Sequence, residues 1–163
     1  FHAPDDQVPF ADSVGELSRL QEEGKILHLG LSNVNADKIE SAQKMVRIET
    51  VQNRFNPMCQ RDLHNGVFKA CNEHEMTYIA YSPVGGGGGH ASLAGHETLT
   101  QIAEEHEATS YEVSLSWALS KGENVLPIPG ASKVSSILSS VKAAKLQLAP
   151  DELKSIDEIS LKA

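Results

Sequence analysis

The sequence predicts an α/β fold in which about four parallel strands alternate with helices, enough for half of an eight-stranded α/β barrel. Three observations predict it. Strand-like and helix-like segments alternate along the 163 residues, as in β-α-β units of a parallel sheet. Only four segments qualify as strands, whereas a closed parallel barrel needs about eight. Polar or glycine-rich loops follow each strand. The strand count alone also allows an open sheet with helices on both faces.

The first half of the chain supplies three of the expected strands. A helix is expected over residues 12–24, because Ser13 and Glu16 have the spacing of a capping box and Gly24 suits a helix end. The elements that follow are a strand at 26–31, a helix at 35–46 capped by Asn35, a strand at 48–52, a helix at 61–75 and a strand at 76–81.

The second half supplies the fourth strand. Helices are expected at 97–107 and 111–121, the second with a capping box formed by Thr109 and Glu112. The last strand, at 125–129, contains Pro127 and Pro129 and is therefore expected to be short and distorted. Helices follow at 134–144 and 150–161. With no long linker and no shift in composition, we expect one domain over residues 1–163, forming part of a larger barrel.

Composition argues against several classes of partner. A formal charge of −8 disfavours nucleic acid and anionic membrane surfaces, which attract clustered Lys and Arg. No segment approaches the roughly 20 apolar residues of a membrane span, and residues 1–10 do not resemble a signal peptide. Cys59 and Cys71 match no zinc or redox spacing, and two thiols suggest a reducing, cytoplasmic location. The opening Phe1-His2-Ala3-Pro4, without Met, suggests that the chain is cut at its start.

The strand ends carry the residues that are suited to binding a ligand. Ligands of parallel sheets gather at the C-terminal ends of the strands. These ends carry Ser32-Asn33, Gln52-Asn53, Tyr81-Ser82-Pro83-Val84-Gly85 and Gly130-Ala131-Ser132-Lys133. Because all four groups share one edge of the predicted sheet, we expect a ligand platform there.

Each group also has a simpler interpretation. The glycine run 85–89 would let backbone amides approach an anion, or form a flexible solvent loop. Gly130 and Lys133 lie where a strand gives way to a helix, which suits a phosphate, but also an ordinary helix start with a solvated lysine. Tyr81 could stack on a planar ring or simply pack. Asn33 and Gln52 could bind a carboxamide or cap local loops.

Other residues favour structural roles. His90, His96 and His106 lack the spacing of metal ligands on a helix, so no metal site is predicted. Trp117 and Val113 share an apolar helix stripe and are expected in the core. No Ser-His-Asp or Cys-His set is supported by spacing.

At the strand-end loops the sequence closely resembles the C-terminal part of the aldo-keto reductase family, from His2 to the end. Four stretches in order carry the resemblance. They are GKILHLGLSN at 24–33, VQNRFN at 51–56, IAYSPVG at 79–85 and VLPIPGASK at 125–133. The family fold is a (β/α)8 barrel that binds NADPH across the C-terminal edge of its strands, so the resemblance implies that cofactor.

The resemblance also implies roles for individual residues. Ser32, Asn33 and Gln52 would hold the nicotinamide carboxamide, and Tyr81 would stack on its ring. His2 would be the catalytic histidine that polarises the substrate carbonyl, or else a frayed terminal residue. The pyrophosphate would be lined by Ser82, Pro83, Val84, Gly85 and Gly86. The 2′-phosphate, which distinguishes NADP from NAD, would be met by Ser132 and Lys133, and Gly130 of the same loop would also belong to the cofactor site.

The sequence departs from the family pattern in two ways. The catalytic Asp, Tyr and Lys belong to the half of the barrel that this chain lacks, so hydride transfer would lack its acid. Ser139-Ser140 replaces the Glu-Asn pair that often contacts adenine. Three hypotheses therefore stay open: part of an NADPH-dependent reductase of a small carbonyl substrate, a non-catalytic NADP-binding module, and a half-barrel that forms homo-oligomers through its sheet edges.

Overall fold

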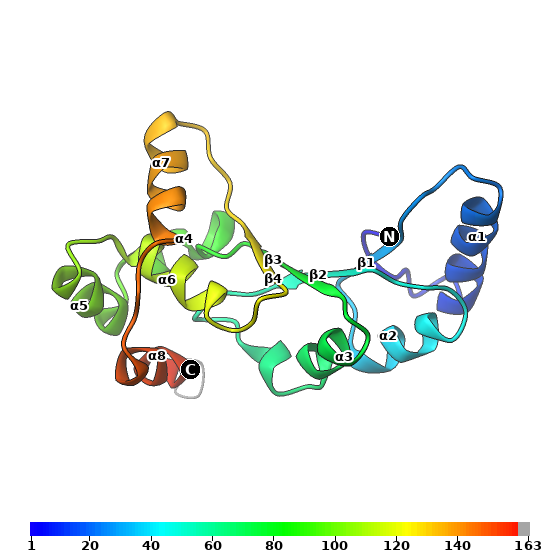
Figure 1. The fold of residues 1–163 in the computed structure, drawn as a ribbon, viewed down its shortest axis with the longest axis horizontal. Coiled ribbons are helices and arrows are strands. Elements are labelled where there is room, and N and C mark those ends of the chain that lie inside the picture. The colour runs from blue at the N-terminus through cyan, green and yellow to red at the C-terminus, as the bar shows by residue number, and fades with distance from the viewer. Residues whose placement is uncertain (160–163) are drawn as a thin grey trace. The chain divides into compact units, whose positions relative to one another are not determined.

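The computed structural model describes residues 1–159, in which eight α-helices, one 3-10 helix and four strands follow one another (Figure 1). In chain order the elements are α1 (Phe10–Glu22), β1 (Gly30–Ser32), α2 (Ala36–Gln43), β2 (Thr50–Arg54), η1 (Arg61–Leu63), α3 (Val67–Glu73), β3 (Thr77–Tyr81), α4 (Gly86–Ala94), α5 (Glu97–Glu105), α6 (Ser110–Leu119), β4 (Val125–Ile128), α7 (Val134–Ala143) and α8 (Pro150–Asp157).

The strands lie in the sheet order β1-β2-β3-β4, which is also their order along the chain. β1 and β2 pair in parallel, with Gly30 opposite Thr50, Leu31 opposite Val51 and Ser32 opposite Gln52. Parallel strands that follow the chain order, with a helix in each connection, confirm the predicted α/β class.

Two compact units divide the chain, one made of Phe1–Asn53 with Arg61–Ile79 and the other of Arg54–Gln60 with the chain from Ala80 onward. In the first unit, α1, α2 and α3 bury apolar side chains beside β1 and β2. Its buried core consists of Val14, Leu29, Leu31, Val34, Ile39, Ala42, Ile48, Val51, Val67, Phe68, Ala70, Cys71, Met76 and Tyr78. The prediction of a single domain stays a prediction.

The second unit is built around α6, whose residues from Glu112 to Ala118 are all buried. Trp117 stacks on Phe55, with ring centroids 4.9 Å apart. Its indole Nε1 donates to Asp157 Oδ1 on α8 at 2.7 Å, and Lys121 forms an ion pair with the same carboxylate. The predicted core position of Trp117 is confirmed.

Local capping chemistry explains several boundaries. Asn35 accepts a hydrogen bond from Lys38 N at the start of α2, as expected. Thr109 and Glu112 form the predicted capping box of α6. The box predicted for Ser13 and Glu16 is wrong, because α1 already begins after Pro9 and Glu16 instead pairs with Arg19.

Three predicted segments need correction. The strand expected at 26–31 begins only at Gly30, since Gln21 Nε2 captures the carbonyl of Leu27 and Leu27 stays exposed. The helix expected at 61–75 is divided into η1 and α3, because Gly66 adopts a left-handed φ of 88° between them. The final helix ends at Asp157, and the predicted end at Leu161 lies outside the described residues.

Within residues 1–159, no helix combines the length and the hydrophobicity that are needed to cross a bilayer.

Candidate functional site

The ends of β1 and β2 bring three predicted site residues together. Ser32 and Gln52 lie opposite each other in the ladder. The Ser32 hydroxyl donates to the Gln52 carbonyl oxygen at 2.7 Å, and the Asn33 amide donates to the same oxygen at 3.0 Å. This shared acceptor fixes the turn out of β1, so Ser32, Asn33 and Gln52 form one polar cluster within the first unit.

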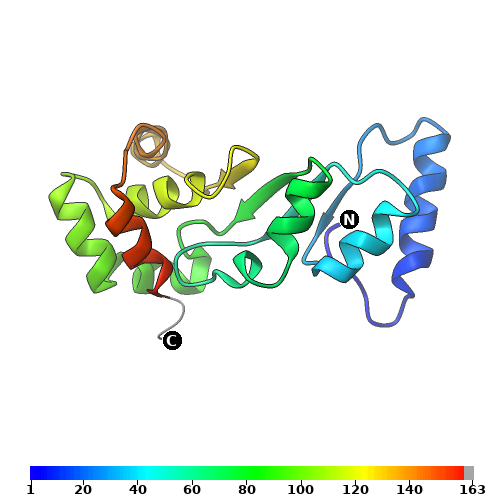
Figure 2. The same cartoon turned by 60° about the horizontal axis from the view of Figure 1, so that its bottom comes forward.

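His2 joins this cluster through its backbone. The N-terminal residue runs beside β1 (Figure 2), because the Phe1 amino group donates to Gly30 O at 2.8 Å and Ser32 N donates to Phe1 O at 2.9 Å. The Asn33 side-chain nitrogen then donates to His2 O at 2.9 Å. The imidazole of His2 is exposed, so it is available to a ligand at the end of β1.

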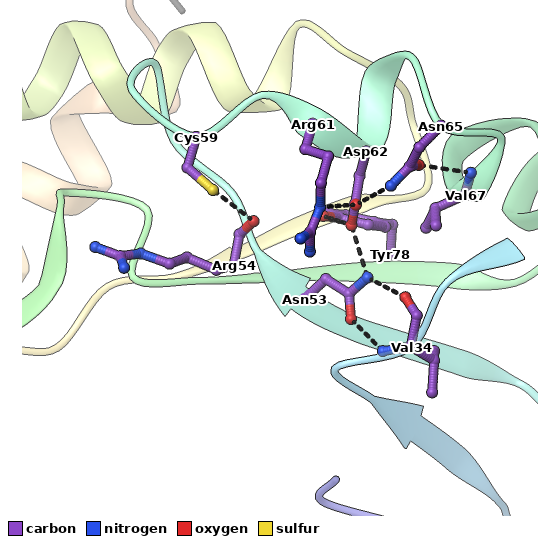
Figure 3. Close-up of polar contacts among 9 residues, drawn as sticks. All are labelled: Val34, Asn53, Arg54, Cys59, Arg61, Asp62, Asn65, Val67 and Tyr78. Carbon is purple, nitrogen blue, oxygen red and sulfur yellow. Dashed lines mark hydrogen bonds and ion pairs between the residues drawn. The ribbon is translucent and has the colours of Figure 1, made fainter. Parts of the chain in front are cut away.

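The backbone of Asn33 adopts a left-handed φ of 56°, a conformation that asparagine tolerates better than most residues. The next residue, Val34, is held by the side chain of Asn53. Asn53 Oδ1 accepts from Val34 N at 3.1 Å and its Nδ2 donates to Val34 O at 2.8 Å (Figure 3). The turn is therefore pinned on both sides of the strained residue.

Asn53 leads to a buried carboxylate. Asp62 on η1 is 1% exposed, and its Oδ2 accepts from Asn53 Nδ2 at 2.6 Å and from the Tyr78 hydroxyl at 2.9 Å. Oδ1 accepts from Asn65 Nδ2 at 2.9 Å. Burial, and then the charge of Asp62, raise the pKa of the Cys71 thiol to about 12, which keeps it neutral at physiological pH.

In the second unit, three side chains fix the loop that leaves β3. Tyr81 is half-buried at the strand end, and the next residue, Ser82, takes a left-handed φ of 50°. The carbonyls that follow are bound by Asn56 Nδ2 at Ser82 (3.0 Å), by Ser114 Oγ at Pro83 (2.6 Å) and by Arg54 Nη2 at Gly85 (3.1 Å).

The glycine run is a helix start, and the expectation of a flexible loop is wrong. Gly85, at φ 91°, precedes α4, whose first four residues are all glycine. A Cβ on Gly85 would meet the carbonyl oxygen of Gly89 at 2.5 Å, so only glycine fits there. The first amides of a helix have no partner within it and favour anions, and the Arg54 guanidinium lies against the same turn.

A cavity of about 270 Å³ opens between the β3–α4 loop and the start of α7. The Tyr111 hydroxyl and His90 Nδ1 are 2.7 Å apart at its wall, and their rings lie 4.2 Å apart. Its lining, all within the second unit, consists of Val84, His90, Thr109, Tyr111, Leu115, Pro129, Gly130, Ser135, Ser136, Ser139 and Ser140.

Glu112 orients one hydroxyl of this cavity. Its Oε1 accepts from Ser139 Oγ at 2.9 Å, and its Oε2 accepts from Thr109 N at 2.8 Å. Burial alone raises the pKa of Glu112, but these hydrogen bonds and the charge of Lys142 outweigh burial and lower it. Glu112 therefore stays ionised, and Ser139 presents its oxygen lone pairs rather than its proton to the cavity.

Of the three residues predicted near a phosphate at the start of α7, only one lines this cavity. Gly130 lines it, whereas Ser132 and Lys133 are exposed and lie outside its lining, with Lys133 at the N-cap of α7. Sequence reasoning missed Arg54 and the His90–Tyr111 pair. Arg54 lies in the VQNRFN stretch, and its position at the C-terminal end of β2 was the available signal. No local pattern could pair His90 with Tyr111, which are 21 residues apart.

A larger cavity, of about 380 Å³, contains no predicted site residue. It is lined by apolar side chains of α6, β4 and α7, among them Leu119, Leu126, Ile137 and Val141. Its only polar side chain is Ser140, whereas several hydroxyls and the His90 imidazole line the smaller cavity, so the smaller cavity is the better candidate for a polar ligand.

Comparison with known proteins finds relatives over nearly the whole chain. The family model of the Aldo/keto reductase family matches residues 1–161. The chain is 31% identical to "Probable aldo-keto reductase 1" of Glycine max, in an alignment of 96% of this chain with 53% of that protein. It is 32% identical to "Pyridoxine 4-dehydrogenase" of Escherichia coli K12, with 91% and 50% covered. The chain thus spans about half the length of the curated relatives it matches.

Solved structures give the same result. The thermostable aldo-keto reductase Tm1743, crystallised with epalrestat, superposes with a TM-score of 0.85 at 27% identity, over 98% of this chain and 58% of that one. An aldo-keto reductase from Klebsiella pneumoniae in complex with NADPH gives 0.84 at 22% identity, over 98% and 57%. The four parallel strands with their helices therefore match little more than half of a (β/α)8 barrel.

Proposed function

Because the chain belongs to the aldo/keto reductase family, we propose that it supplies the NADP(H)-binding part of an oxidoreductase that reduces a small carbonyl compound. One observation carries the proposal: His2, the Ser32-Asn33 pair and Gln52, which come from three separate parts of the sequence, meet in one hydrogen-bonded cluster at the end of β1. A nicotinamide carboxamide needs both donors and acceptors, and this cluster offers both.

The second unit suits the other end of a dinucleotide. The amides at the start of α4 and the Arg54 guanidinium favour a pyrophosphate. The cavity of about 270 Å³ would take the adenosine, with Tyr111 as a flat apolar wall and Ser139 as an acceptor for an amino group. Lys133, exposed at the start of α7, would pair with a 2′-phosphate and so favour NADP over NAD.

The proposed reaction moves a hydride to the carbonyl carbon and a proton to its oxygen, giving an alcohol and the oxidised cofactor. A bound reduced nicotinamide supplies the hydride. His2 donates a hydrogen bond to the carbonyl oxygen and polarises it. The proton requires an acid that the family takes from a tyrosine in the other half of the barrel. We therefore expect the 163-residue chain alone to bind cofactor without turnover.

A titration of the chain with NADPH and with NADH, followed by nicotinamide fluorescence, tests the proposal. We expect NADPH to bind more tightly, and Lys133→Ala to weaken NADPH binding by roughly tenfold while it leaves NADH unchanged. Lys44→Ala, an exposed lysine in the first unit, is the matched control. Failure to bind either cofactor would contradict the proposal. Carbonyl-dependent oxidation of NADPH by the chain alone would contradict only the expected lack of turnover and the non-catalytic alternative.

A second function, self-assembly, is favoured by an apolar surface on β4 and α7. Its large side chains are exposed, and β4 is the last strand of the sheet order, with an edge to which another strand could add. The surface, which we name the α7 face, consists of Leu126, Ile128, Val134, Ile137, Leu138 and Val141. We propose that a second copy of the chain covers the α7 face.

A cytoplasmic location is proposed with this function. It is supported by free thiols at Cys59 and Cys71, which persist in reducing compartments.

A further inference from the structure

We propose that Asn53 and Asp62 form a positioning pair that holds the turn after β1 in the shape that binds the nicotinamide end of the cofactor. The inference rests on the proposed NADP(H) function and assigns a role to two residues that do not themselves belong to the exposed cluster. Both are 1% exposed, so neither is placed to touch a ligand. Their influence would pass through Val34 to Asn33.

The first step is the pair of hydrogen bonds between the Asn53 side chain and the backbone of Val34. Asn53 binds the amide and the carbonyl of Val34 at once, at 3.1 and 2.8 Å. Two antiparallel hydrogen bonds from one planar group fix both the position and the orientation of a peptide segment. Asn33 comes directly before it in the left-handed conformation, at φ 56°, which persists only where the surroundings impose it.

The second step is the control of Asn53 by Asp62. A carboxylate accepts hydrogen bonds and donates none, so Asp62 Oδ2, at 2.6 Å, must face the Nδ2 side of the amide. The two Nδ2 protons then go to Asp62 and to Val34 O, and Oδ1 is left to accept from Val34 N. A flipped amide would set Oδ1 against both the carboxylate and the carbonyl oxygen of Val34. Asp62 thereby selects the one orientation of the Asn53 amide that can bind both backbone groups of Val34 (Figure 3).

The third step is that other residues of the fold hold the Asp62 carboxylate in place. The Tyr78 hydroxyl on β3 and Asn65 Nδ2 bind the same carboxylate, each at 2.9 Å. Arg61 Nε approaches Oδ1 only to 3.7 Å from an exposed position. The carboxylate is therefore held by neutral donors that belong to the fold, and the Asn53 amide is the link toward the turn.

The test separates the two ends of the cofactor. We expect Asn53→Ala to raise the Kd for NADPH by roughly tenfold, as when only about a tenth of the molecules keep a competent turn. The Kd for 2′,5′-ADP, which lacks the nicotinamide, should stay unchanged. Gln43→Ala is the matched control, since Gln43 binds the amide and the carbonyl of Ile48 in the same way within the first unit but does not contact Val34. Its NADPH affinity should equal that of the unsubstituted chain.

Each other outcome has a defined meaning. Equal NADPH affinities of Asn53→Ala and the unsubstituted chain would overturn the positioning role and leave the proposed function intact. An equal loss of NADPH and 2′,5′-ADP binding would assign Asn53 a general structural role and also overturn it. If the unsubstituted chain binds no NADPH, both proposals fail. Should Asn53→Ala not fold, as judged by circular dichroism, Asp62→Asn is measured instead, with the same selective loss expected.

Discussion

At the scale of single residues, Glu112 shows how one buried side chain stabilises two segments. Its carboxylate closes the capping box of α6 and also accepts from Ser139 on α7. A buried carboxylate that lost these donors would bear the full cost of desolvation. Its lowered pKa reports that the donors outweigh burial.

We predict that Glu112→Gln lowers the free energy of unfolding by about 1–2 kcal/mol at neutral pH. Because the folded-state pKa lies below the ordinary 4.5, the charge stabilises the fold above that pH and the contribution is lost as the pH falls through the folded value. Urea unfolding at several pH values should show the difference between the two proteins shrinking below 4.5. Thr109→Ala, which keeps the carboxylate, should retain most of that pH dependence.

The pKa shift of Cys71 has the opposite sign to that of Glu112 and affects stability at alkaline pH. Its thiol pKa is raised from 9.0 to about 12, first by burial and then by Asp62. The contribution to stability is therefore fully present below pH 9.0 and declines as the pH rises toward 12, by at most about 1.4 kcal/mol per pH unit.

Cys71→Val should remove this part of the alkaline loss of stability. The measurement is the midpoint of denaturant unfolding at several pH values over roughly two pH units above pH 8, as far as the chain still folds reversibly. The slope of this midpoint against pH is then compared between the two proteins. Identical slopes for the two proteins would show that Cys71 does not titrate on unfolding. Cys59→Val, at a half-exposed position, should leave the slope unchanged.

At the scale of elements, α4 is a helix that begins with glycines. Glycine costs about 1 kcal/mol in a helix relative to alanine, so four in succession make a weak first turn. The structure holds that turn through Gly85, whose φ of 91° no other residue adopts without strain.

We predict opposite effects for two neighbouring substitutions in this run. Gly85→Ala should destabilise the chain by about 1–3 kcal/mol, because its Cβ would meet Gly89 O at 2.5 Å and its φ is left-handed. Gly88→Ala has open space around its Cβ and should stabilise by up to about 1 kcal/mol. Thermal unfolding compares the two. Equal effects would mean that the helical turn is not formed.

The sequence predicted most elements because their signals are local. Thr109 and Glu112 sit three residues apart, so their capping box was visible in the sequence. The start of β1 was not, since it depends on Gln21 reaching the carbonyl of Leu27. The loop predicted for the glycine run was wrong for a similar reason. The conformational entropy of glycine favours a loop, and only tertiary contacts, such as that of Arg54 with Gly85, favour the helix.

At the scale of the whole molecule, alternation of strands and helices was enough to predict the class of fold. The same alternation led to the prediction that the candidate residues share one edge of the sheet. It could not reveal the groups that hold those residues. Asn53 meets Asp62 through a bend of the chain, and Ser139 meets Glu112 from 27 positions away. Such pairs follow from the tertiary fold.

Self-association is the prediction that belongs to this scale. Leu138→Glu places a charge on the α7 face, where Leu138 is 65% exposed, and should shift the mass in solution toward that of a monomer. Leu27→Glu is the matched control, since Leu27 is an equally apolar, 77% exposed residue outside the α7 face. Light scattering after size exclusion gives the masses. A monomeric unsubstituted chain would rule out the assembly.

The two thiols also differ in how easily a reagent in solution can reach them. Cys59 is half-exposed in the second unit, and Cys71 is buried in the first. A thiol reagent should therefore modify one cysteine at once and the other only when the first unit opens. The slow phase measures how often that unit opens, so the lifetime of its closed state can be read without denaturant and without any bound ligand.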